Sequence, residues 1–173
     1  MFNFDSLAVG AALILVVSGC SKSHTASPTI DPLTSFKIIA DNCQGAIMES
    51  DRVWPGKISG VGRTIIKPGQ KSFDVKKTDS LVSPHIGYID LNFVEQLSIA
   101  ATEEALRAFS TPVVSTVNHW RLTYAMQGGK WKLQEELYSF AMPDMGIKEE
   151  APKKMEIGSL AGRVPAAAVC NPT

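Results

Sequence analysis

The clearest alternation of hydrophobic and polar residues lies in residues 117–140, on both sides of a Gly128-Gly129 pair. Two glycines between alternating segments are typical of a two-residue hairpin turn, which pairs Gln127 with Lys130 and Met126 with Trp131. The same register continues to pair Trp120 with Leu137, Leu122 with Glu135, Arg121 with Glu136 and His119 with Tyr138. Aromatic pairs and opposite charges then fall opposite each other, as in stable hairpins. Only the pairing of Leu122 with an acid conflicts with this register.

Other stretches also alternate with a period of two and predict further strands. Residues 85–97 place Ile89, Leu91 and Phe93 on one face. Residues 63–67 and 72–77 read as two strands joined by Pro68-Gly69, a pair suited to a type II turn. Residues 51–62 read as a loop or as the start of an edge strand.

Two segments have helical spacing instead. Residues 33–50 place Phe36, Ala40 and Cys43 on one side, and Asp31 or Thr34 can cap the start. Gly45 weakens this helix and favours an end near it. Residues 102–110 predict a short helix capped by Thr102.

These elements predict an α+β fold. An N-terminal helix packs on an antiparallel sheet of four or five strands, with a short inserted helix and a C-terminal hairpin. A cystatin-like or nuclear-transport-factor-like arrangement fits this order, but a likeness at the level of fold does not give a function. Residues 142–173 are rich in proline and glycine and predict an irregular tail. The expected organisation is a single globular domain over residues 32–173.

The start of the chain has a different pattern. Residues 7–20, LAVGAALILVVSGC, are uncharged and apolar or small, and the run is short for a helix that spans a bilayer. Small residues before Cys20 resemble a bacterial lipobox, although the six residues before the run contain no Lys or Arg. The alternative is an ordinary signal peptide, or a short anchor, with a cysteine there by chance.

The lipobox resemblance implies a signal peptide over residues 1–19, removal of that peptide, and a lipid on Cys20. The polar residues that follow complete a flexible tether over residues 20–31. Ser21 at the second mature position implies sorting to the outer membrane, so that the domain faces the periplasm. The lipid anchor would then hold the domain at the membrane. The resemblance implies several acyl chains on Cys20, as stable attachment requires.

Composition argues against one class of partner, nucleic acid, and indicates how the cysteines are paired. Lys and Arg together number 17, as do Asp and Glu, and no basic stripe supports nucleic-acid binding. With Cys20 lipidated, Cys43 and Cys170 form a pair that reads as a disulfide in an oxidising compartment. Two separate buried thiols are the alternative. Neither cysteine has another Cys or a His at metal-ligand spacing, so no metal is expected.

The sequence contains no phosphate-binding loop, nucleophile elbow or metal-binding His pair, and no cofactor is expected. In this hairpin register His119, Arg121, Glu136 and Tyr138 share one sheet face, where Asp90 or Tyr88 could join them. A His beside a carboxylate can do acid–base chemistry. The plainer interpretation of this possible ligand face is a solvent-facing surface of cross-strand pairs.

Two segments, TDSLVSPHIGYIDL and YAMQGGKWKL, resemble parts of uncharacterised bacterial envelope proteins, a likeness that implies no function. The first functional hypothesis is therefore a non-enzymatic envelope lipoprotein that binds a protein partner, as an assembly factor or an inhibitor. The second is a small-ligand-binding domain or enzyme with a pocket between helix and sheet. A third is a structural envelope component without a discrete ligand.

Overall fold

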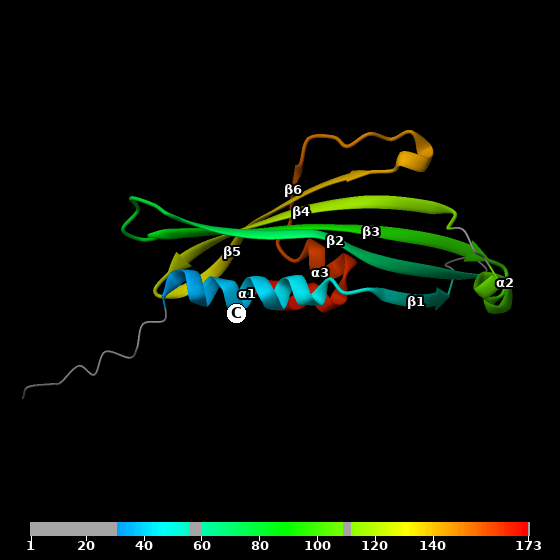
Figure 1. Ribbon diagram of the computed structural model, residues 1–173, viewed down its shortest axis with the longest axis horizontal. Helices are drawn as coiled ribbons and strands as arrows, with labels where there is room; N and C mark the ends of the chain where they lie inside the picture. The colour runs from blue at the N-terminus through cyan, green and yellow to red at the C-terminus, as the bar shows by residue number, and fades with distance from the viewer. Residues whose placement is uncertain (1–30, 56–59, 109–111, 173) are drawn as a thin grey trace, which may run out of the picture.

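A computed structural model describes residues 31–55, 60–108 and 112–172. Six antiparallel strands form one sheet in the order of the sequence, from β1 at one edge to β6 at the other (Figure 1). The elements are α1 (Pro32–Ala46), β1 (Ser50–Pro55), β2 (Val61–Lys77), β3 (His85–Ala100), α2 (Glu103–Ala108), β4 (Val114–Gln127), β5 (Lys130–Ala141), η1 (Pro143–Met145), β6 (Lys153–Met155), α3 (Ser159–Arg163) and η2 (Pro165–Cys170).

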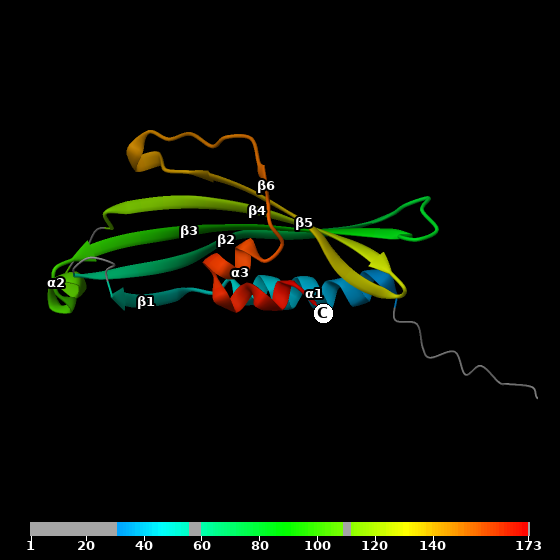
Figure 2. The same ribbon diagram turned by 180° about the vertical axis from the view of Figure 1, so that it is seen from behind.

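The sheet has two different faces. Helices α1, α3 and η2 lie against one of them, which we call the inner face (Figure 2). Residues 142–152 stand off the opposite, outer face, and we call this segment the arch (Figure 1). The α+β class and the antiparallel sheet are as predicted, but the sheet has six strands rather than four or five. The two edge strands are short: β1 lies where the sequence predicts a loop or the start of an edge strand, and β6 lies in the tail predicted to be irregular.

Helix α1 supplies one side of the core. Asp31 caps it by accepting a hydrogen bond from the Thr34 backbone N–H at 3.0 Å, and the helix ends at Ala46, just after Gly45. Phe36 is fully buried against the inner face. Gly87 makes this approach possible, because a Cβ atom there would lie 2.4 Å from the Phe36 ring. Aromatic packing around Phe36 involves Tyr124 and Trp131.

The prediction of two strands joined by a turn at Pro68-Gly69 is wrong. Strand β2 is continuous, and its pairing with β3 is interrupted only between Pro68 and Lys71. Both halves of β2 pair with β3, so the chain continues in one direction through Pro68-Gly69. Proline lacks a backbone N–H, and an irregularity of this kind is where a strand tolerates it.

The β4–β5 hairpin begins as predicted and then departs from the predicted register. Gly128 and Gly129 have φ of 57° and 77°, as a primed turn requires, and the pairs from the turn to Tyr124–Leu133 are confirmed. Gln134 then has no cross-strand partner, so the remaining pairs shift by one residue. The observed pairs are Trp120 with Tyr138, Leu122 with Glu136, Arg121 with Leu137, and His119 with Ser139.

The predicted disulfide between Cys43 and Cys170 is present and excludes the alternative of two free thiols. It joins α1 to η2 across 127 residues of sequence and holds the C-terminal segment on the inner face. The tail predicted to be irregular thus contains β6, α3 and η2. In the described ranges no helix is long and apolar enough to cross a membrane. The signal peptide, Cys20 and nearly all of the tether lie outside those ranges.

Candidate functional site

Polar side chains cluster on the outer face where two cross-strand rows meet. One row consists of Ser72, Asp90, Arg121 and Leu137, and the next contains Asn92, His119 and Ser139. Arg121 Nε donates to Asp90 Oδ1 at 2.7 Å, and this bond raises the pKa of the guanidinium. Asp90 is one of the two residues expected to join the predicted face.

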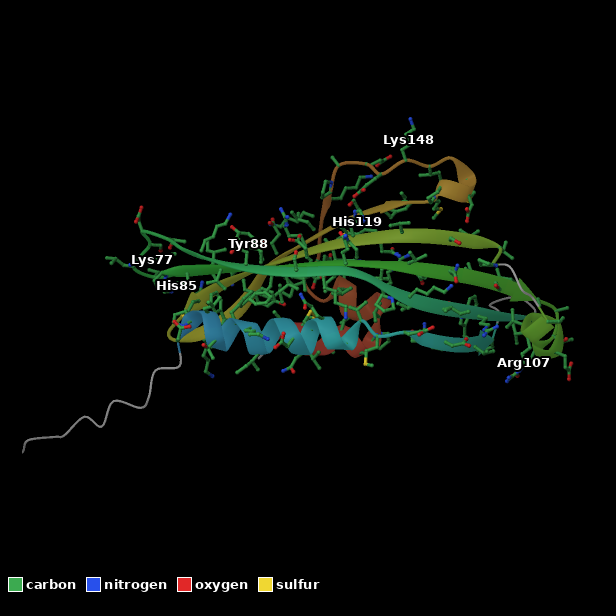
Figure 3. All side chains as sticks on the ribbon, viewed as in Figure 1. Lys77, His85, Tyr88, Arg107, His119 and Lys148 are labelled. Atoms are coloured by element: carbon green, nitrogen blue, oxygen red, sulfur yellow. A yellow bond between two sulfur atoms is a disulfide. The ribbon has the colours of Figure 1, made fainter. Side chains whose placement is uncertain are left out.

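The arch, which follows β5, lies over this cluster, and Figure 3 shows its Lys148 above His119. Glu149 Oε1 lies 2.6 Å from His119 Nδ1 and accepts a hydrogen bond from Ser139 Oγ, also at 2.6 Å. The hydroxyl of Ser139 and then the His119 ring lower the pKa of Glu149. A polar cavity of about 350 Å³ lies between the arch and the sheet, bounded by Pro152 on the arch side.

The structure does not bring the four predicted ligand-face residues together. His119 and Arg121 are on the outer face, whereas the register shift places Glu136 and Tyr138 on the inner face. Glu136 is 2% exposed and accepts hydrogen bonds from the backbone N–H groups of Gly158 and Leu160, at 2.6 and 2.9 Å. It therefore holds the start of α3.

Tyr138 is half-buried and has a structural contact of its own. Its hydroxyl donates to Asn118 Oδ1 at 2.8 Å, and burial raises the pKa of the phenol. Sequence reasoning missed Glu149 and Ser139. Glu149 lies 30 residues from His119 in an irregular segment, and no periodic pattern links the two.

The outer-face cluster is poorly arranged for nucleophilic catalysis. Ser139 donates to the carboxylate that also contacts His119, so the imidazole is not placed to take a proton from that hydroxyl. Arg121 is already paired with Asp90. Across the described residues, no group of three His, Cys, Asp or Glu side chains is placed to hold a metal. The cluster can bind a small polar group or fasten the arch.

A second, apolar cavity of about 360 Å³ lies where the end of α1 meets β1, β2 and the junction of α3 with η2. Its walls include Ala46, Ile66 and Val164, and Met48 at its rim is 66% exposed. Arg163 Nη2 and Glu95 Oε2 form an ion pair of 2.7 Å at another side. This cavity has the size and the mainly apolar lining usual for ligand sites.

Strand β1 runs along this apolar cavity and forms one edge of the sheet. Ser50 and Arg52 contribute to the cavity, and Val53 is exposed. The strand pairs with β2 on one side. In the part of the chain that is described, no backbone hydrogen bond is made on its other side. An edge of this kind can accept an added strand from another chain.

No protein-family model, curated protein sequence or solved structure matches this chain. The fold is that of a disulfide-bonded α+β domain with a six-stranded antiparallel sheet.

Replacing Glu149 with alanine should loosen the arch without unfolding the domain, because Glu149 is its contact to both His119 and Ser139. Faster hydrogen exchange should be confined to residues 142–152. In the parent chain the contact is complete above the ordinary glutamate pKa of 4.5. It should be lost as pH falls through the lowered pKa of the folded state. Exchange corrected for intrinsic rates at pH 7 and pH 3 measures both effects.

Glu150→Ala is the matched control, since Glu150 pairs with Lys153, three residues further along the chain, and not with His119 or Ser139. Equal exchange rates in the two variants would show that Glu149 does not hold the arch.

Proposed function

We propose that this chain is a lipid-anchored envelope protein whose folded domain binds a partner protein and catalyses no reaction. The lipobox-like residues before Cys20 support a lipid anchor, and Ser21 supports an outer-membrane location facing the periplasm. The disulfide agrees with an oxidising compartment, where such bonds persist.

One observation carries the binding role: the apolar cavity lies beside the edge of β1 on which the described residues make no backbone hydrogen bond. A partner segment that adds to β1 as a strand would gain main-chain hydrogen bonds, while an apolar side chain of that segment would enter the cavity. Met48 would contact the partner at the rim. The charged side chains of the outer-face cluster, by contrast, are paired with one another, His119 with Glu149 and Arg121 with Asp90.

The anchor is tested by replacing Cys20 with serine. The variant should lose incorporation of labelled fatty acid and should leave the membrane fraction when membranes are washed with salt. The parent chain should keep both properties. A serine variant that is still acylated would disprove the anchor at this position.

The partner contact is tested by placing a photo-crosslinking residue at Met48 in intact cells. Met145 on the arch is the matched control, because it is a methionine of similar exposure, 61%. We expect a discrete adduct from position 48 and none of the same mass from position 145. Adding Ala46→Trp, which fills the cavity, should reduce the adduct at least tenfold. Identical adducts from both positions would refute the contact.

A small apolar ligand is the second candidate, favoured by the volume of the same cavity. It predicts that the purified protein binds an apolar fluorescent probe and that Ala46→Trp abolishes this binding. No adduct would then form at Met48. The two outcomes separate the candidates, since only the first requires another protein.

A further inference from the structure

The turn between β2 and β3 exposes two apolar side chains at its tip. Leu81 is 100% exposed and Val82 is 74% exposed. Burying a side chain of this size out of water is favourable, so a turn in contact only with water gains nothing from a Leu-Val tip. This turn is the start of the TDSLVSPHIGYIDL segment.

The tip is held in shape by its own polar groups. Thr78 N–H donates to the Pro84 carbonyl at 2.8 Å, and Thr78 Oγ1 donates to the Ser83 carbonyl at 2.5 Å. Ser83 N–H donates to Ser80 Oγ at 3.1 Å. Because the hydroxyls are used inside the turn, the two apolar side chains project outward from an ordered backbone. Little conformational entropy remains to be lost when they are buried.

This tip lies at the end of the domain where the chain enters α1 (Figures 1 and 2). Leu33, in the first turn of α1, is a further exposed apolar residue. Only eleven residues, 21–31, separate Cys20 from α1. An extended chain spans at most about 3.6 Å per residue, so this end stays within about 40 Å of a lipid on Cys20.

The charges at this end suit a phospholipid surface. Lys77, Lys130 and Lys132 are exposed, and Figure 3 shows Lys77 at the same end as the tip. Lys76 is also exposed, but it lies 3.8 Å from Asp74. Asp79 is the one acid of the tip itself. Asp31, the exposed cap of α1, is a second acid at this end. Among the described residues the three lysines without an ion pair thus outnumber the two such acids, which favours anionic headgroups.

The opposite end of the sheet differs in charge. It carries α2, with Glu103 and Glu104 in its first turn, and Arg107 there is paired with Glu103. Val113 at that end is 58% exposed, so both ends have exposed apolar residues, but in α2 two acids stand against one arginine.

We propose that Leu81 and Val82 insert into the phospholipid surface that holds the anchor, so that the β2–β3 turn fixes the orientation of the domain on its membrane. This proposal rests on the proposed lipid anchor, which keeps the β2–β3 turn close to the bilayer. The domain would then stand with its long axis away from the membrane, and α2 would be its distal end.

The test places an environment-sensitive dye on a single introduced cysteine. Leu81→Cys is compared with Val113→Cys in the full acylated protein, reconstituted in vesicles of phosphatidylethanolamine and phosphatidylglycerol. Cys43 and Cys170 are bridged and do not react. We expect emission at position 81 to shift to shorter wavelength and to be quenched by spin-labelled lipid. Emission at position 113 should remain that of a dye in water.

A second variant separates insertion of the tip from an effect of the dye. Val82→Asp in the Leu81→Cys protein should lower the ratio of inserted to exposed tips about tenfold or more, since an apolar side chain is lost and a charge is added. Dye emission at position 81 equal to that at position 113 would overturn the proposal. An emission shift in native envelope vesicles but not in pure lipid would overturn it too, because the tip would then contact a protein.

Failure of the anchor is detected separately in the parent chain. If Cys20 carries no lipid, its free thiol takes up the dye, and intact mass shows no acyl chains. The same vesicles then test the tip with Cys20 replaced by serine, so each proposal can fail without the other.

Discussion

Replacing Cys43 and Cys170 together with alanine should lower the free energy of unfolding by about 4–5 kcal/mol. The bond joins residues 127 apart, and closing so long a loop removes much of the conformational freedom of the unfolded chain. Alanine is preferred to serine here because both cysteines are buried and a hydroxyl would be left without a partner. Domains commonly have about 5–15 kcal/mol of stability, so this is a large share.

Removing the disulfide should destabilise the C-terminal segment, α3 and η2, more than the rest of the domain. The Tyr124 hydroxyl donates to the Cys170 carbonyl at 2.5 Å, and η2 packs on α1 beside the bond. Without the disulfide, η2 is retained only by noncovalent contacts of this kind and by its connection to α3. Hydrogen exchange of residues 159–170 should therefore rise more than that of β3 and β4.

Denaturant unfolding with and without a reductant measures the effect. The parent chain in reductant should unfold near the midpoint of the double variant, and the double variant should not respond to reductant. A parent midpoint that reductant leaves unchanged, with both thiols shown to be free, would contradict the predicted stabilisation.

The sequence predicts those parts of the fold in which local pattern and environment agree. Alternation in β3 and around Gly128-Gly129, and the helical spacing of Phe36, Ala40 and Cys43, all correspond to burial on the inner face. At Pro68-Gly69, within the long strand β2, the sequence wrongly predicts a turn, because a turn and a strand irregularity use the same residue types.

The candidate site could be predicted only in part, because a single unpaired residue decides which side chains share a face. Side chains in a strand alternate with a period of two, so the shift at Gln134 moves every later residue of β5 to the opposite face. His119 and Arg121 precede the shift on β4 and lie with Asp90, as expected. Glu149 reaches them through the arch, and such a long-range contact leaves no periodic trace in the sequence.

The same shift makes Glu136 structurally important, and replacing it with alanine should lower the free energy of unfolding by about 3–4 kcal/mol. Its two carboxylate oxygens accept hydrogen bonds from Gly158 and Leu160, where α3 begins. Hydrogen bonds to a charged group contribute about 1.5–3 kcal/mol each, and the alanine variant would leave both N–H groups unpaired near Leu122. Circular dichroism during urea unfolding measures the change. Glu136→Gln, which keeps one acceptor oxygen, should lose about half as much.

Glu135 provides a control that also tests the register. In the observed pairing its side chain is on the outer face and lies 3.1 Å from Lys154, a surface ion pair. Glu135→Ala should therefore cost less than about 1 kcal/mol. In an unbroken hairpin the roles are reversed, because Glu135 would then lie opposite Leu122 in the core and Glu136 would face solvent. A larger loss at Glu135 than at Glu136 would show that the strand continues without the shift and would return Glu136 to the face of His119 and Arg121. A larger loss at Glu136 requires the shifted register, and with it the attachment of α3 and η2 to the inner face.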